Sequence, residues 1–140
     1  MEYRKFDNTY VIRLDVGEEI IEQLTAVAEK EKIRLAQVSA IGAINDFTIG
    51  VYNVAEKKYY PESFTGPWEI VSLCGSITSM DEKPYLHLHL SAGTLQGKTA
   101  GGHLTRAVIS ATCEIFVNVL DGNVGRVKDE VTGLNIFKFE

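Results

Sequence analysis

A single segment of this chain has the periodicity of an α-helix, and most of the chain after that segment is patterned like β-strands. In the segment GEEIIEQLTAVAEKEKI, apolar residues recur at helical spacing and would form one stripe facing a core. Glutamates stand at its start and lysines at its end, the order that the helix dipole favours. The stripe consists of Ile20, Ile21, Leu24, Val27 and Ala28. We therefore predict one principal helix, at about residues 18–31.

Strand-like segments account for most of the remaining chain. They are rich in β-branched and aromatic residues and are separated by breakers such as Gly66 followed by Pro67. We predict strands at residues 10–16, 35–42, 47–54, 57–64, 68–78, 84–92 and 107–120, then a closing hairpin that turns near Gly133. About seven or eight strands with one helix indicate an α+β fold with a mainly antiparallel sheet. The 140 residues fit a single domain, residues 1–140, whose first few residues we expect to fray.

The sequence contains no sign of a membrane or secreted protein. No segment is apolar over the ~18 residues that a membrane-spanning helix needs. The opening MEYRKFDN lacks the apolar region of a secretory signal. Cys74 and Cys113 lie in alternating apolar runs, so we expect both to be buried, reduced thiols rather than a disulfide or metal ligands. We therefore expect a cytoplasmic protein with no membrane partner.

The charge balance disfavours direct binding to DNA. The chain has 14 Lys and Arg against 19 Asp and Glu, which gives a formal net charge of −5. Duplex binding depends on cations that displace counterions from phosphates, and no run rich in Lys or Arg is present. A symmetric oligomer could still concentrate a local basic patch, so direct binding to DNA is disfavoured but not excluded.

All three histidines fall within YLHLHLSAGTLQGKTAGGHL, residues 85–104. Because side chains alternate along a strand, Leu86, Leu88 and Leu90 would share the core face, and His87 and His89 would be neighbours on the other face. Their Cα atoms would be about 6.5–7 Å apart. Two imidazoles at that separation can converge on one metal ion.

The third histidine, His103, comes directly after the glycine-rich GKTAGG. We expect this segment to be a flexible loop that brings His103 over the histidine pair. Gly101 and Gly102 would shape this loop, by close backbone approach or positive φ. Three histidine ligands would leave an open coordination position on zinc or another divalent transition metal.

Other interpretations of the histidines remain open. His-x-His on a strand also fits a polar surface, or histidines that bond to each other at a subunit contact. The motifs of common metalloproteases, P-loops and serine hydrolases are absent. Glu69, Asp81 and Glu114 could serve as a base by composition alone, so no catalytic residue is assigned and enzymatic activity stays undecided.

Three segments together resemble the PPC domain, named for plants and prokaryotes conserved. They are VIRLDVGEEIIEQLTAVAEKEKIRLAQVSAIGAI, PWEIVSLCGSIT and LHLHLSAGTLQGKTAGGHL, and the likeness runs from about Arg4 to Phe139. The resemblance implies a strongly curved, mainly antiparallel sheet with a flanking helix, and a homotrimer. It also implies a metal site, which His87, His89 and His103 would match, beside a tight turn that Gly101 and Gly102 would match.

The resemblance leaves three functions in competition. In plants the PPC domain comes after an AT-hook, an Arg-Gly-Arg-Pro element that binds AT-rich DNA, and this chain contains no such element. The label of DNA-binding protein that stand-alone members carry is therefore an analogy at the level of the fold. We expect a homotrimeric metal-binding protein that could take a small-molecule ligand and whose activity is unassigned. The alternatives are a DNA-associated regulator and a scaffold that binds partner proteins.

Overall fold

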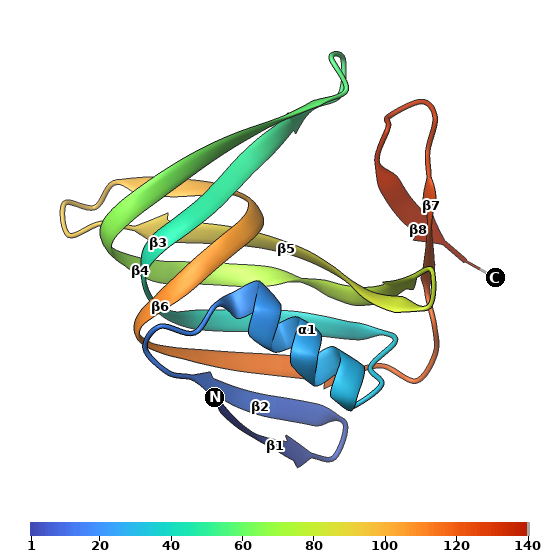
Figure 1. The fold of residues 1–140 in the computed structure, drawn as a ribbon, viewed down its shortest axis with the longest axis horizontal. Helices are drawn as coiled ribbons and strands as arrows, with labels where there is room; N and C mark the ends of the chain where they lie inside the picture. The colour runs from blue at the N-terminus through green and yellow to red at the C-terminus, as the bar shows by residue number, and fades with distance from the viewer. Residues whose placement is uncertain (140) are drawn as a thin grey trace.

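The protein combines one helix with an antiparallel sheet, as a computed structural model describing residues 1–139 shows (Figure 1). The described residues form a helix and eight strands. These are β1 (Glu2–Phe6), β2 (Thr9–Leu14), α1 (Ile20–Lys30), β3 (Ala36–Asn53), β4 (Lys58–Met80), β5 (Lys83–Gly93), β6 (Thr99–Val119), β7 (Gly125–Lys128) and β8 (Asn135–Lys138). The predicted α+β fold class is confirmed.

The main sheet is antiparallel and curls back on itself. Its strands lie in the order β1-β2-β6-β3-β4-β5, and β5 pairs a second time with β6. That extra pairing joins β3, β4, β5 and β6 into a closed circuit of hydrogen-bonded neighbours, which requires the long strands to bend (Figure 1). The predicted curvature is therefore present.

The predicted helix forms, although it begins at Ile20 rather than near residue 18. Glu19 is the N-cap residue, and its carboxylate accepts from the backbone N–H of Glu22 at 2.8 Å. The same carboxylate accepts from the buried N–H of Ala107 on β6 at 2.7 Å, which ties the helix start to the sheet. The apolar stripe is buried as predicted, through Ile20, Leu24, Val27 and Ala28.

Two predicted breaks in the sheet are absent. The strands predicted at residues 35–42 and 47–54 merge into the continuous strand β3, which covers residues 36–53, and those predicted at 57–64 and 68–78 merge into β4, which covers residues 58–80. Gly66 and Pro67 form a bulge instead of a chain break, because Ile44 pairs with Trp68 while Asp46 pairs with Thr65. The φ of +97° at Gly66 allows the bend, and pairing resumes beyond it.

The N-terminal residues were expected to fray, and this expectation is wrong. Residues 2–6 form β1, which pairs with β2 in register from Glu2 opposite Arg13 to Phe6 opposite Thr9. The short β1 segment has too few residues for its alternation to be recognised. Backbone hydrogen bonds to β2 hold β1 in place.

The core lies between α1 and the inner face of the sheet, and it includes Leu88 and Leu90 of β5 as the alternation predicts. Cys113 is fully buried, but Cys74 is exposed, which corrects the expectation that both thiols are buried. Cys74 pairs with His89 across the strands and therefore shares the outer face of β5. Both cysteines are free. Among residues 1–139, no helix has the length and apolar character needed to cross a membrane.

The β7–β8 hairpin lies outside the main sheet, next to the turn that joins β3 to β4 (Figure 1). The hydroxyl of Tyr52 donates to the carbonyl oxygen of Thr132 at 3.0 Å, and the Lys57 ammonium donates to that of Glu130 at 2.7 Å. These bonds hold the hairpin opposite the outer face of β5, where the histidines lie.

Candidate metal centre

The three histidines meet on the outer face of the β5–β6 pair. His89 and His103 are direct partners in the antiparallel register, and His87 lies two residues before His89 on β5. Ring centroids are 5.2 Å apart for His87 and His89, 5.2 Å for His87 and His103, and 5.6 Å for His89 and His103. One ring nitrogen from each histidine lies within 4.8 Å of those of the other two.

These separations suit a small metal ion after modest side-chain rotation. Three nitrogens about 2.0–2.1 Å from a tetrahedral zinc would be about 3.3 Å from one another. The donor set consists of three imidazoles, which suits zinc, copper, nickel and iron. Three protein ligands would leave a fourth position for water or a ligand.

His103 is carried by a strand, which corrects the predicted loop. The β5–β6 pairing continues down to Gly93 opposite Thr99, so the true turn covers only residues 94–98. Within it, the Thr94 N–H donates to the Lys98 carbonyl at 2.8 Å. The glycine-rich sequence looked like a flexible loop because glycine is uncommon inside strands.

Gly101 and Gly102 accordingly lie in β6, and neither has a positive φ. The predicted close approach of the backbone holds for Gly102. A Cβ atom there would lie 2.6 Å from the carbonyl oxygen of Gly50 on β3. At Gly101 the nearest atom would be 3.4 Å away, close to ordinary contact. Gly102 therefore lets β3 approach the strand that carries His103.

The substitution Gly102→Ala is expected to lower the free energy of unfolding by about 1–3 kcal/mol, because the added methyl overlaps backbone that cannot rotate away. Urea unfolding followed by circular dichroism measures the change. Gly101→Ala is the matched control one residue away and should cost clearly less. Equal losses in the two variants would contradict the assigned contact between β6 and β3.

Tyr59 of β4 supports His103 from the side. Its hydroxyl donates to the carbonyl oxygen of His103 at 3.2 Å and lies 2.9 Å from the Thr105 hydroxyl. The two rings meet edge to face with centroids 5.9 Å apart. Gly50 makes room for this ring, since a Cβ there would lie 2.5 Å from the tyrosine Cζ. Tyr59 thereby restricts how β6 and His103 can move.

The environment of two of the histidines favours the neutral form of the imidazole. Burial, and then the charges of His103, Arg126 and His89, lower the pKa of His87 to about 4. Burial and the charge of His89 lower the pKa of His103. A neutral imidazole has the free lone pair that a metal ligand requires.

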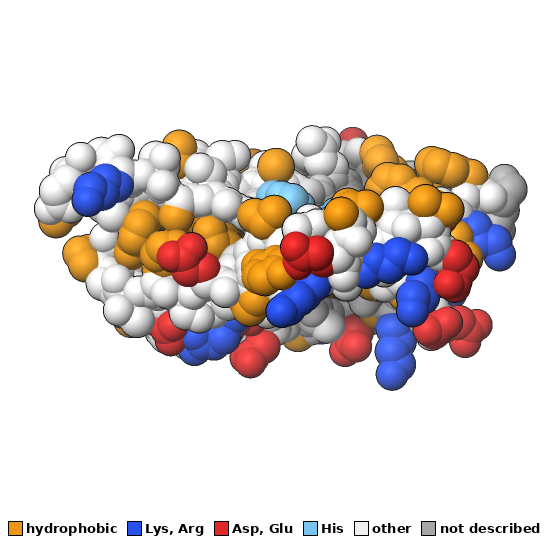
Figure 2. Space-filling view, turned by 90° about the horizontal axis from the view of Figure 1, so that it is seen from above, with side chains coloured by type: hydrophobic (Ala, Val, Ile, Leu, Met, Phe, Trp, Pro, Cys, Tyr) orange, Lys and Arg blue, Asp and Glu red, His pale blue; other side chains and the backbone are white. Residues whose placement is uncertain are grey.

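The histidines form part of the floor of an open cleft with a volume of about 1000 Å³. Its walls come from β3, β4, β5, β6 and the β7–β8 hairpin, and they include Tyr52, Tyr59, Tyr85, Arg126 and Phe137. Seen from above, histidine lies near the middle of the molecule with apolar side chains around it (Figure 2). The volume is at the upper end of the range typical of small-molecule sites.

The acidic residues named as possible bases do not reach this cleft. Glu69 lines a different hollow beside Trp68, and Glu114 lines a hollow formed by β1, β2 and β6. Asp81 lies in the turn between β4 and β5. None of the three is among the residues that line the cleft, so the structure assigns no base beside the histidines.

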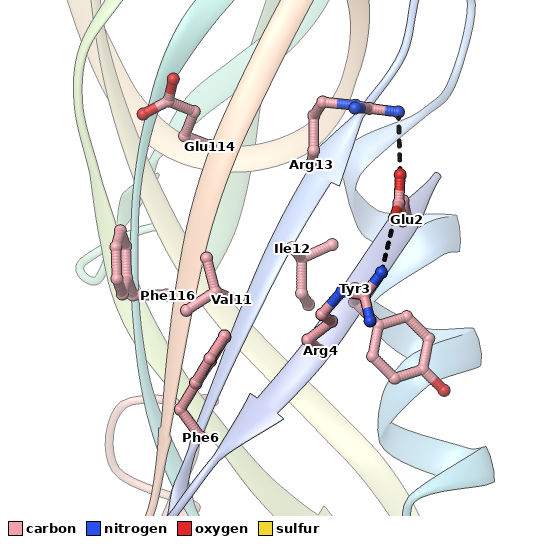
Figure 3. Close-up of a pocket in the computed structure, with 9 residues that line it drawn as sticks. All are labelled: Glu2, Tyr3, Arg4, Phe6, Val11, Ile12, Arg13, Glu114 and Phe116. Atoms are coloured by element: carbon pink, nitrogen blue, oxygen red, sulfur yellow. Dashed lines mark hydrogen bonds and ion pairs between the residues drawn. The ribbon is translucent and has the colours of Figure 1, made fainter.

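The hollow formed by β1, β2 and β6 is smaller, at about 350 Å³ (Figure 3). Glu2 pairs with both arginines of this hollow, lying 3.4 Å from Arg13 and 3.4 Å from Arg4 (Figure 3). These ion pairs are solvent-exposed, and the hollow contains no histidine. The histidine cleft is therefore the stronger candidate site.

Comparison with known families identifies the chain. The model of the Plants and Prokaryotes Conserved domain, abbreviated PCC or PPC, matches residues 1–121. The chain belongs to this family. The resemblance found in the sequence is thus confirmed, and this PCC-domain protein can be set beside its solved relatives.

Solved structures share the fold over 99% of this chain. A candidate DNA-binding protein from Bacteroides thetaiotaomicron is 32% identical, with a TM-score of 0.96 and 96% of that chain covered. A protein from Archaeoglobus fulgidus described as metal-containing is 36% identical, with a TM-score of 0.89 and 96% covered. A plant- and prokaryote-conserved protein from Pyrococcus horikoshii is 27% identical, with a TM-score of 0.87 and 94% covered.

One curated relative is much longer than this PCC-domain protein. The bifunctional protein GlmU of a Synechococcus strain is 30% identical over 127 residues. The match covers 89% of this chain but only 19% of that protein. The chain thus spans about a fifth of the length of this relative.

Two cleft residues carried no recognisable signal in the sequence. Tyr59 stands in a strand pattern, and Arg126 stands in the closing hairpin without any motif around it. Both reach the histidines only because β4 and the hairpin are brought beside β5 and β6. Residues joined by tertiary contacts in this way cannot be found from local spacing.

Proposed function

We propose that this PCC-domain protein binds a divalent transition metal, zinc foremost, through His87, His89 and His103. The observation that carries the proposal is the convergence of three ring nitrogens within 4.8 Å of one another. The lowered pKa values of His87 and His103 also favour the neutral form that binds metal. The relative from Archaeoglobus fulgidus that is described as metal-containing supports the same proposal.

The proposal includes a ligand position but no reaction. Three imidazoles leave the metal able to accept an oxygen or nitrogen atom from a small molecule in the cleft. A bound metal would supply Lewis acidity to such a ligand. No catalytic residue is assigned, because no candidate base lines the cleft.

The test is the metal content of protein purified without chelator and without a metal-affinity resin. We expect about one metal ion per chain, measured by inductively coupled plasma mass spectrometry, and loss of the ion in His89→Ala. Cys74→Ser is the matched control, because Cys74 is an exposed thiol directly opposite His89 and should not be needed. Wild-type protein that takes up no metal, or a His89→Ala variant that keeps it, would contradict the proposal.

Binding to DNA is the second candidate, favoured by the description of the Bacteroides relative as a candidate DNA-binding protein. The net charge of −5 weighs against it. Titration of an AT-rich duplex over a series of salt concentrations tests this second candidate. Specific binding with a steep salt dependence would support the second candidate, and absence of binding at physiological salt would remove it.

We further propose a homotrimer in the cytoplasm, on the resemblance to PPC domains and on the free cysteines. Exposed apolar side chains on the sheet, including Ile41, Val71 and Phe116, offer surface for contacts with further copies or with a partner protein. Light scattering coupled to size exclusion tests the trimer, and a monomeric mass would overturn it.

A further inference from the structure

The guanidinium of Arg126 occupies a fixed position at one side of the histidine cleft. It lies between two aromatic rings, 4.5 Å from the centroid of Tyr85 and 4.6 Å from that of Phe137. Tyr85 belongs to the same strand as His87 and His89, while Phe137 belongs to β8. Stacking of this kind holds the planar group in one orientation.

Hydrogen bonds use only part of this guanidinium. Nε donates to the Thr78 hydroxyl at 2.9 Å, Nη1 donates to the carbonyl oxygen of Asn135 at 2.8 Å, and Nη2 lies 3.5 Å from the Ser76 hydroxyl. A guanidinium has five N–H donors. At least two of them therefore have no acceptor among residues 1–139, and the group lines the cleft.

The charge of Arg126 has no carboxylate partner within the described chain. The ion pairs of residues 1–139 that involve arginine belong to Arg4, Arg13 and Arg106. Burial lowers the pKa of Arg126, and its charge is one of the causes that lower the pKa of His87. A cation that is partly removed from water without a counter-charge favours the arrival of an anion.

The rest of the cleft is suited to an apolar body. The residues that line it include Val51, Tyr52, Leu134, Ile136 and Phe137, the last of which stacks on Arg126. Sites of this kind hold a ligand by apolar walls and orient it by a small number of polar groups. Here the polar groups are the cation of Arg126 and the histidine cluster.

We infer that the cleft binds a small organic anion, with its oxyanion group held by Arg126 and its apolar body against the aromatic wall beside the histidines. The oxyanion is a carboxylate or a phosphate, since both match the donor geometry of a guanidinium. The inference rests on the proposed function in one respect, because a bound metal would take a second polar atom of the same ligand. Residues 122–140 lie outside the family match, so Arg126 is a feature beyond what the family model covers.

Isothermal titration with four probes tests the inference on zinc-loaded and on metal-free protein. Benzoate and phenyl phosphate carry the two oxyanions on an apolar ring, acetate lacks the ring, and benzamide lacks the charge. We expect benzoate or phenyl phosphate to bind, and acetate and benzamide to bind at least about tenfold more weakly. The aromatic anion that binds with the higher affinity identifies the preferred oxyanion.

The variant Arg126→Gln should weaken binding of the aromatic anion by at least about tenfold, which corresponds to about 1.4 kcal/mol, and Arg126→Lys should retain part of it. Arg4→Gln is the matched control, because Arg4 is an exposed arginine that lines the separate hollow formed by β1, β2 and β6. Zinc content and the thermal midpoint of each variant establish that it is folded and that the histidines still bind metal.

The inference is overturned if benzoate and benzamide bind wild-type protein equally, if neither aromatic anion binds, or if a folded Arg126→Gln variant binds as wild type does. The benzoate and benzamide comparison needs no variant, so it decides the matter even if Arg126→Gln does not fold. Protein that takes up zinc without binding either anion would leave the proposed function standing and remove this inference. Protein that binds benzoate through Arg126 but takes up no metal would leave this inference standing and remove the proposed function.

Discussion

Removal of the metal from zinc-loaded protein is expected to lower the midpoint of thermal unfolding by about 10 °C. The histidines belong to two neighbouring strands, so a metal bound to His87, His89 and His103 would join β5 to β6 in the folded state only. A ligand present at a hundred times its dissociation constant stabilises the folded state by about 2.7 kcal/mol. For a chain of this size, 1 kcal/mol corresponds to about 3–5 °C.

Differential scanning calorimetry with and without a chelator measures this shift. His89→Ala should unfold at the same temperature in both conditions, because it lacks a ligand. Cys74→Ser should behave as the wild type, although Cys74 is the cross-strand partner of His89. A shift of equal size in His89→Ala would mean that the chelator acts elsewhere, and no shift in the wild type would contradict a structural contribution from metal.

The metal-free protein should lose stability as the pH falls from about 6.5 towards 4, in part because of His87. Its pKa is lowered to about 4 in the folded state, whereas an unfolded histidine titrates near 6.5. Between these values the unfolded chain binds more protons than the folded chain, so the free energy of unfolding rises with pH. The contribution of His87 is therefore complete above about pH 6.5 and disappears as the pH falls through about 4.

Urea midpoints measured at several pH values between 7.5 and 4 test this prediction on chelator-treated protein. Residue 87 cannot titrate in the His87→Gln variant, so the free energy of unfolding of this variant should fall less steeply as the pH is lowered over this window. The difference between the two slopes should correspond to at most about one bound proton per chain. The two proteins should have parallel profiles above pH 7. Parallel profiles over the whole window would show that His87 is not held neutral in the folded state.

The zinc-loaded protein should show a steeper acid loss than the metal-free protein. Metal ligands must be deprotonated, so protons compete with the metal for all three imidazoles. The difference in thermal midpoint between loaded and metal-free protein should therefore shrink as the pH falls below about 6.

Local patterns in the sequence determined several features of this protein. The apolar stripe predicted α1 because residues three or four apart share a face of a helix. The strict alternation of YLHLHLSA placed Leu88 and Leu90 in the core and His87 and His89 together outside it, because side chains of a strand alternate faces. These features depend only on backbone geometry within a few residues. The family also was recognisable, from three motifs within residues 11–104, all of which lie inside the family match over residues 1–121.

Only the tertiary structure decided how the site is completed. His103 joins the pair because β6 lies in the register that sets it opposite His89, and a slip of one residue would turn its side chain to the other face. Tyr59 and Arg126 reach the cleft because β4 and the β7–β8 hairpin pack beside it. Strand register and hairpin placement depend on the free energy of the whole sheet, which sums contacts between residues far apart in the chain. Spacing along the sequence contains no measure of that sum. For this reason it predicted that the three histidines form one cluster, but not that His103 lies on a strand or which residues form the walls of the cleft.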